Sequence, residues 1–182
     1  MNQVAILGGT FDPIHNGHIS IALKVIEELS LDEVWFMPNN KSPFKLDKKI
    51  ASAVDRIKMI KLAINSHNRL KVCDYEISNS DVSYTYNTMK TLVELYPNNK
   101  FYFIIGADQA NSLDHWYKIE GLKELVTLII LKREGYQLDP IKDAIMIDND
   151  FYKVSSSEEK INGFKNINEE VKDYIKEMKL YE

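Results

Sequence analysis

The segment GGTFDPIHNGH, from Gly8 to His18, gathers three glycines, a proline and two histidines directly after a short apolar run. Glycines at the end of a strand let backbone N–H groups approach a ligand closely. His15 and His18 lie three residues apart at an expected helix start, where both imidazoles can face one concavity beside the positive end of the helix dipole. Imidazole and backbone N–H groups are donors that suit phosphate oxygens. The segment therefore predicts a site for a phosphate-bearing ligand.

Other kinds of site fit this segment less well. The G-x-G-x-x-G pattern fails because residue 10 is Thr10, and the Walker pattern fails because no Gly-Lys-Ser/Thr follows. Cys73 is the single cysteine of the chain, which excludes a cysteine-based zinc site. The histidine pair also lacks a third metal ligand at a clear spacing. A helix cap at Asn16 with two surface histidines is the plainest alternative.

Short apolar runs alternate with amphipathic stretches along the chain. The runs cover residues 4–8, 34–38, 70–77, 100–106, 127–133 and 144–148. Helical spacing is expected within 19–29, 53–64 and 171–178, with Leu23 and Met178 among the buried positions. Apolar strands separated by helices indicate an α/β fold, here a Rossmann-like open parallel sheet with helices on both faces. Its ligand site lies at the carboxyl ends of the strands, where Gly8 stands.

Composition and charge exclude several classes of protein. A chain of 182 residues with 45% hydrophobic and 27% charged residues is typical of one soluble domain, so 1–182 is expected to be a single unit. A net charge of -4 gives no whole-molecule attraction to nucleic acid or to an anionic membrane. No signal-type segment and no apolar stretch of the ~18 residues that a membrane span needs are visible. We therefore expect a cytoplasmic protein that binds neither, and a homo-oligomer is compatible with the sequence.

Further segments, together with GGTFDPIHNGH, resemble in order and spacing the nucleotidyltransferases that carry a His-x-Gly-His motif. Within that family the resemblance is to the nicotinate mononucleotide adenylyltransferases of bacteria. The segments are PNNKSPFK (38–45), Arg56, SYTYNT (83–88), IIGAD (104–108), Trp116 and VSSSEEK (154–160). The resemblance implies a nucleotidyltransferase domain that transfers AMP from ATP to the 5′-phosphate of nicotinate mononucleotide and releases pyrophosphate. It also implies that Mg²⁺ arrives with ATP, so no metal site on the protein is expected.

The resemblance assigns the phosphate chemistry mainly to the first loop. His15 and His18 would be the catalytic residues and would donate hydrogen bonds to the ATP phosphates. His18 would stabilise the charge that develops at the α-phosphoryl group. Asp108 would accept from a ribose hydroxyl, although a helix N-cap explains this residue equally well. Further ATP or phosphate contacts are implied for Gly8, Gly9, Thr10, Phe11, Lys45, Gly106, Ser156, Ser157 and Lys160.

A second set of residues is implied for the pyridine nucleotide. An aromatic ring would stack on the pyridine, two asparagines would line the pocket, and backbone N–H groups at a helix start would receive the nicotinate carboxylate. Since backbone groups would distinguish nicotinate from nicotinamide, residue types leave that choice open. The implied residues are Asn39, Asn40, Tyr84, Thr85, Tyr86 and Trp116.

Two departures from the family pattern leave alternative functions open. Lys160 stands where arginine is usual, and Phe44 stands where histidine is usual. The segment SSSEEK is similar to that of phosphopantetheine adenylyltransferase, a sister enzyme that usually has threonine at the position of His15. A nucleotide-binding relative without turnover is the other alternative. A capping box of Ser155 with Glu158, or of the next serine and glutamate, would explain the serines without a ligand.

Overall fold

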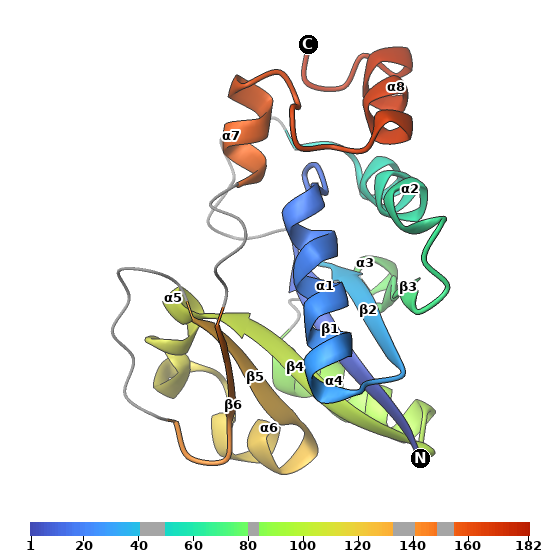
Figure 1. The fold of residues 1–182 in the computed structure, drawn as a ribbon. Helices are drawn as coiled ribbons and strands as arrows, with labels where there is room; N and C mark the ends of the chain where they lie inside the picture. Colours follow the sequence, from blue (N-terminus) through green and yellow to red (C-terminus); the bar gives the residue numbers. More distant parts are fainter. Residues whose placement is uncertain (41–49, 80–83, 133–140, 149–154) are drawn as a thin grey trace.

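The computed structural model describes residues 1–40, 50–79, 84–132, 141–148 and 155–182. Within them, strands form one sheet whose neighbours are all parallel, in the order β3-β2-β1-β4-β5-β6 (Figure 1). The strands are β1 (Asn2–Gly9), β2 (Glu33–Pro38), β3 (Leu70–Val72), β4 (Asn99–Gly106), β5 (Thr127–Lys132) and β6 (Ile145–Asp148). This is the strand order of a doubly wound fold, whose winding reverses between β1 and β4. The predicted α/β class and parallel sheet are confirmed.

Helices cover both faces of the sheet, as predicted, with α1, α2 and α8 on one face and α4 and α6 on the other. The helices are α1 (Asn16–Leu29), α2 (Ala53–Ile64), α3 (Tyr75–Ser78), α4 (Thr85–Leu95), α5 (Ala107–Ala110), the 3₁₀ helix η1 (Leu113–His115), α6 (Ile119–Leu125), α7 (Ser156–Ile161) and α8 (Glu169–Glu177). Helices α7 and α8 lie at the same end of the molecule as the loop after β1, opposite the N-terminus (Figure 1). No helix in the described part of the chain is long and apolar enough to cross a membrane.

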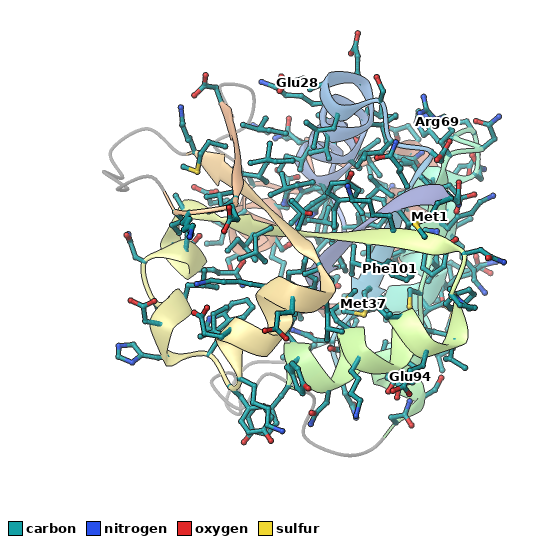
Figure 2. All side chains as sticks on the ribbon, turned by 90° about the horizontal axis from the view of Figure 1, so that it is seen from below. Met1, Glu28, Met37, Arg69, Glu94 and Phe101 are labelled. Atoms are coloured by element: carbon teal, nitrogen blue, oxygen red, sulfur yellow. The ribbon has the colours of Figure 1, made fainter. Side chains whose placement is uncertain are left out.

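Side chains that alternate along the central strands supply two apolar layers. Ala5 of β1 packs with α1 and α2, whereas Ile6 packs with α4 and α6. Figure 2 shows Met37 and Phe101 on the inside of the second layer, where each is 2% exposed. Because the strands are buried on both faces, their sequences are apolar at successive positions. This explains why the strands were predictable as continuous apolar runs.

Two expected core positions are wrong. Leu23 is 37% exposed, because α1 turns Ala22, Val25 and Ile26 toward the sheet and leaves Leu23 on the outer side. Met178 is 50% exposed, because α8 ends at Glu177 and the chain no longer follows the buried stripe. Helical periodicity locates such a stripe only within about one residue, since a turn holds 3.6 residues.

The expected strand over 70–77 is correct only for its first three residues. The backbone N–H of Cys73 makes the last bond toward β2, to the carbonyl oxygen of Phe36 at 2.8 Å. The carbonyl oxygen of Asp74 then accepts from the N–H groups of Ile77 and Ser78, which begins α3. Aspartate favours such helix starts and disfavours strands, so it ends β3 despite the apolar residues that follow.

Candidate active site

The loop after β1 lies where the winding of the sheet reverses. Strand β1 has β2 on one side and β4 on the other, and Gly8 and Gly9 pair in register with Met37 and Pro38 at the end of β2. The N–H of Asn39 donates to the carbonyl oxygen of Gly9 at 2.9 Å. Asn39, a predicted pocket residue directly after β2, therefore lies beside the glycines of the first loop. At such a reversal the crossover helices diverge and leave a crevice at the carboxyl ends of the strands. The first loop is therefore placed to border a ligand.

Neighbouring side chains lie close to two glycines at this edge of the sheet. Phe11 adopts a left-handed φ of 49°, and its ring lies so close to Gly9 that an added Cβ there would be 3.0 Å from it. At the end of β4, a Cβ on Gly106 would lie 2.5 Å from a carboxylate oxygen of Asp108. Gly106 is itself the N-cap of α5, so the alternative that Asp108 is the N-cap is wrong. Asp108 is exposed in the first turn of α5, at the predicted strand end.

His15 and His18 stack on each other at the start of α1. Their ring centroids are 3.7 Å apart with an interplanar angle of 24°, and Phe11 meets the His18 ring edge-on at 5.0 Å. The backbone N–H of His15 donates to Nδ1 of His18 at 3.2 Å. Since Nδ1 accepts this bond, a neutral His18 carries its proton on Nε2. His18 can therefore donate an N–H bond to a ligand without carrying charge.

Burial keeps both imidazoles neutral at pH 7. It lowers the pKa of His15 to about 4, although the carboxylates of Glu159 and Glu158 act in the opposite direction. Burial, and then the neighbouring His15, lowers the pKa of His18 well below 6.5. Two stacked imidazolium rings would repel each other in a site with little water. The pair therefore offers hydrogen bonds rather than fixed positive charge.

The lowered pKa of His15 makes the stability of the protein depend on pH. An unfolded histidine takes up a proton near pH 6.5 and folded His15 only near pH 4, so between these values the unfolded chain holds more protons. The free energy of unfolding therefore falls as the pH is lowered through this window. We expect His15 to account for about 2 kcal/mol of the loss between pH 7 and pH 5.

Urea denaturation at the two pH values measures this effect. His15→Asn removes the titrating group, so its decline from pH 7 to pH 5 should be smaller than that of the unaltered protein by that amount. His115→Asn, at an exposed histidine, is the matched control and should keep the full decline. Equal declines for both variants would contradict the buried neutral state of His15.

Arg56 of α2 joins the first loop to the end of β2. Arg56 is 2% exposed, and its guanidinium donates through Nη1 to the carbonyl oxygens of Thr10 at 2.8 Å and Asn39 at 2.9 Å. Its Nη2 donates to the carbonyl oxygen of Asn40 at 3.1 Å. A planar guanidinium holds several carbonyl groups at fixed spacing. Arg56 therefore sets the predicted phosphate loop and the predicted pyridine pocket relative to each other.

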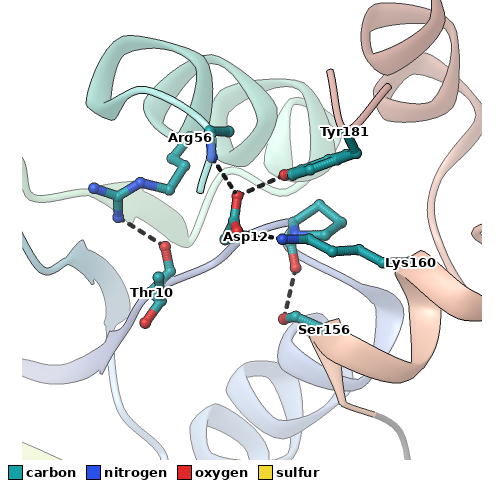
Figure 3. Close-up of polar contacts among 8 residues, drawn as sticks. Thr10, Asp12, Arg56, Ser156, Lys160 and Tyr181 are labelled. Atoms are coloured by element: carbon teal, nitrogen blue, oxygen red, sulfur yellow. Dashed lines mark hydrogen bonds and ion pairs between the residues drawn. The ribbon is translucent and has the colours of Figure 1, made fainter. Parts of the chain in front are cut away.

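The buried carboxylate of Asp12 gathers groups from three other parts of the chain (Figure 3). Its Oδ1 accepts from the N–H of Ala51 at 3.0 Å and from the phenol of Tyr181 at 2.7 Å. Its Oδ2 lies 2.5 Å from Nζ of Lys160, which is also 4.2 Å from the centroid of the Tyr181 ring. Lys160, predicted as a phosphate contact, is therefore brought to the first loop.

Two serines at the start of α7 have different roles, since one caps the helix and the other bonds to the first loop. Ser155 caps the helix, because its Oγ accepts from the N–H of Glu158 at 3.2 Å and the Glu158 carboxylate accepts from the N–H of Ser155 at 2.7 Å. This is the capping box predicted as an alternative. Ser156 donates through Oγ to the carbonyl oxygen of Pro13 at 2.9 Å, while Ser157 is exposed (Figure 3). Because Ser155 provides the helix cap, the hydroxyl of Ser156 is available to bond to the first loop.

Trp116 follows η1, and the Phe103 ring separates it from Gly8 near the end of β1. It packs edge-on against Phe103 of β4, with the ring centroids 6.3 Å apart. The same Phe103 ring would lie 3.5 Å from a Cβ on Gly8. Trp116 is half-buried, so one part of its indole remains accessible. The structure therefore brings this predicted pyridine contact close to the carboxyl end of β1.

The other predicted pyridine contacts belong to an aromatic cluster at the start of α4. Tyr84 is the N-cap and Thr85 the first residue of this helix, so the predicted helix start is confirmed. Tyr84 and Tyr86 both contact Tyr117, with ring centroids 4.7 and 6.2 Å apart. The ammonium of Lys118 lies 5.1 Å from the centroid of the Tyr86 ring. These residues lie on the α4 and α6 side of the sheet, opposite the face covered by α1.

Three buried side-chain atoms in the described part of the chain have no hydrogen-bond partner. They are Nδ1 of His15, Oδ1 of Asn39 and Nε of Arg56. All three residues border the first loop. Buried polar groups are normally paired, so unpaired ones gathered around one loop indicate where a polar ligand or ordered water would complete the bonding. This observation favours the first loop as the ligand site.

The first loop contains three side chains of metal-ligating type, those of Asp12, His15 and His18. Within the described ranges, no three His, Cys, Asp or Glu side chains are grouped to hold a metal ion. The nearby carboxylate of Asp12 already accepts three bonds. Two surface hollows, about 350 Å³ beside α8 and about 450 Å³ beside β3, have neither histidine in their lining. Lys45, the remaining predicted contact, lies outside the described residues.

Sequence reasoning missed two residues of the site, Asp12 and Tyr181, and gave Arg56 no individual role. Asp12 lies within the Gly8–His18 segment, but its neighbours in sequence do not reveal that it contacts a lysine 148 positions away. Tyr181 lies outside every quoted motif, and nothing around it distinguishes it from a surface tyrosine. Arg56 was part of the family resemblance, where its type alone did not reveal that it holds backbone carbonyls.

Comparison with known proteins decides the family. The family model for cytidylyltransferase-like proteins matches residues 6–163, which span the first loop, both histidines and the start of α7. The chain belongs to this cytidylyltransferase-like family. The match begins within β1 and includes the other five strands completely, so it applies to the fold as well as to the loop.

Relatives of this cytidylyltransferase-like chain carry names that agree with one another. A protein of Geobacillus kaustophilus named probable nicotinate-nucleotide adenylyltransferase is 39% identical over 100% of this chain and 87% of its own length. A protein of the same name from Bacillus cytotoxicus is 42% identical over the full length of both. The solved Plasmodium falciparum nicotinic acid mononucleotide adenylyltransferase complexed with NaAD has a TM-score of 0.83 at 27% identity, covering 100% of this chain and 98% of that one.

Proposed function

We propose that this cytidylyltransferase-like protein transfers AMP from ATP to nicotinate mononucleotide, forming nicotinate adenine dinucleotide and pyrophosphate in NAD biosynthesis. The observation that carries the proposal is the stacked, neutral pair of His15 and His18 at the carboxyl end of β1. The names of full-length relatives at about 40% identity support the same activity.

The reaction is a displacement at phosphorus. An oxygen of the acceptor 5′-phosphate bonds to the α-phosphorus of ATP, while the bond from that phosphorus to the α,β-bridging oxygen breaks and its electron pair leaves with pyrophosphate. The acceptor phosphate has a second pKa of about 6, so it is mostly ionised at neutral pH and needs no general base. Catalysis then consists of positioning and of stabilising the charge that develops. The Nε2–H of His18 would stabilise that charge, and His15 would donate to the phosphates beside it.

The remaining phosphate contacts are assigned mainly to the first loop and to the start of α7. Backbone N–H groups would approach the triphosphate where glycine leaves room, and the ammonium of Lys160 would add a positive charge from α7. Mg²⁺ would arrive on the phosphate oxygens and neutralise part of their charge. The proposed contacts are Gly8, Gly9, Thr10, Phe11, Lys45, Gly106, Ser156, Ser157 and Lys160, with Asp108 on a ribose hydroxyl.

The pyridine nucleotide is assigned to the other side of the reversal point. Trp116 would stack on the pyridine ring, and the backbone N–H groups of Tyr84, Thr85 and Tyr86 at the start of α4 would bind the nicotinate carboxylate. Asn39 and Asn40, which Arg56 holds beside the first loop, would line the pocket between the two substrates.

Pyrophosphate release with three acceptors tests this function. We expect rapid release with ATP, Mg²⁺ and nicotinate mononucleotide, and slower release with nicotinamide mononucleotide, which lacks the carboxylate. Reactions without acceptor provide the background. Release with phosphopantetheine alone would assign the chain to the sister activity instead. ATP binding without release from any acceptor would make it a nucleotide-binding relative that lacks turnover.

A further inference from the structure

The segment around Tyr181 is held against the first loop in a specific conformation. Tyr181 and Lys179 both adopt left-handed backbone angles, with φ of 71° and 50°. Such angles are unfavourable for residues other than glycine, so surrounding contacts must maintain them. The N–H of Leu180 donates to the carbonyl oxygen of Ile175 at 3.0 Å, and the Tyr181 ring lies 5.9 Å from that of Phe164. These contacts direct the phenol of Tyr181 to Asp12 (Figure 3).

We propose that Tyr181 is a positioning residue for ATP: by binding Asp12 it fixes the place of the Lys160 ammonium, which receives the triphosphate. The proposal rests on the function assigned above and adds a residue to its phosphate site. Tyr181 acts in two ways, because its hydroxyl orients the Asp12 carboxylate and its ring lies 4.2 Å from the ammonium.

The geometry leaves Lys160 able to contact a phosphate. An ammonium group has three N–H donors, and Asp12 accepts one of them. The side chain of Lys160 is 26% exposed, whereas that of Asp12 is 6% exposed, so part of the lysine side chain is accessible beside a buried carboxylate. A free lysine side chain samples many rotamers, and holding it in place removes most of the entropy that binding would otherwise cost.

The contacts of Tyr181 also keep its hydroxyl a donor. Burial, and then the hydrogen bond to the Asp12 carboxylate, raises the pKa of Tyr181 above its ordinary value. The phenol therefore stays protonated at every pH at which the protein would be assayed. Replacing Tyr181 with phenylalanine therefore removes one hydrogen-bond donor and no charge.

The test compares Tyr181→Phe with Tyr174→Phe in the full-length protein. Tyr174 is the matched control, because it is also a tyrosine whose phenol donates to a carboxylate, but to that of Asp55 at 2.8 Å and not to Asp12. Calorimetric titration should show ATP binding about fivefold weaker in Tyr181→Phe, the loss expected for one hydrogen bond. AMP binding should be unchanged, since AMP lacks the outer phosphates that Lys160 would contact. Tyr174→Phe should bind both nucleotides as the unaltered protein does.

A Lys160→Met background identifies the route of the effect. If Tyr181 acts through Lys160, the Tyr181→Phe change should leave ATP affinity unaltered in that background. An equal effect in both backgrounds would overturn the proposal, as would unchanged ATP binding in Tyr181→Phe. Equal weakening of ATP and AMP together with a lower melting temperature would show a merely structural role. Because binding is measured without turnover, absence of pyrophosphate release from the unaltered protein would contradict the proposed function alone.

Discussion

Replacing His18 with alanine is expected to lower turnover by about 10²–10³-fold while the dissociation constant for ATP changes little. The neutral imidazole carries its proton on Nε2, because Nδ1 accepts from the backbone N–H of His15, so Nε2–H is the group that would donate to the α-phosphoryl oxygen. A donor of this kind acts on charge that appears mainly in the transition state, so its removal affects kcat more than binding. Steady-state kinetics of pyrophosphate release, together with calorimetric ATP titration, measure the two quantities separately.

Two further variants sharpen this prediction. His18→Gln places an amide N–H near the position of Nε2 and should recover part of the lost turnover. His67→Ala, at a histidine beyond the end of α2, should behave as the unaltered protein. If His18→Ala retained full turnover, or if it lost ATP binding in proportion to turnover, the assigned role of His18 would be wrong.

Replacing Arg56 with alanine is expected to lower the free energy of unfolding by about 3 kcal/mol or more. The guanidinium is buried and donates to three backbone carbonyl oxygens, those of Thr10, Asn39 and Asn40. The variant leaves these acceptors without their donor and opens a cavity beside the first loop. Turnover should also fall, since both sides of the site lose their common support. Urea denaturation followed by circular dichroism measures the stability.

Arg69 provides the matched control for Arg56. It also donates to backbone carbonyl oxygens, to that of Asp32 at 3.1 Å and to that of Leu31, but from an exposed position. Water can replace these bonds, so Arg69→Ala should cost about 1 kcal/mol or less. Similar losses for the two variants would mean that burial of the Arg56 guanidinium does not set its contribution.

The fold was largely predictable because the central strands are buried on both faces. Continuous apolar runs fixed the positions of β1, β4 and β5, and the spacing of apolar residues located α1 and α2. The strand order was not predictable from the runs, since every parallel order places helices between strands. The strand predicted over 70–77 was too long, because Asp74 ends β3 and the residues after it form α3.

The site was predictable where its residues are close in sequence. Glycines and histidines within one loop revealed the stacked pair at the start of α1. The Asp12, Lys160 and Tyr181 contacts were not predictable, because they join residues far apart in sequence and depend on where α7 and the segment after α8 pack. The neutral state of the histidines was also hidden, since burial sets it and residue type does not.

The long separation of these partners bears on how the protein is made. Asp12 lies 148 positions before Lys160 and 169 before Tyr181. A ribosome adds about 5–20 residues per second and releases the N-terminal part first. All six strands are therefore synthesised before Tyr181 is added, and the sheet can begin to form while the proposed phosphate site still lacks these contacts. We expect nascent chains to acquire their structure before they acquire full affinity for nucleotide.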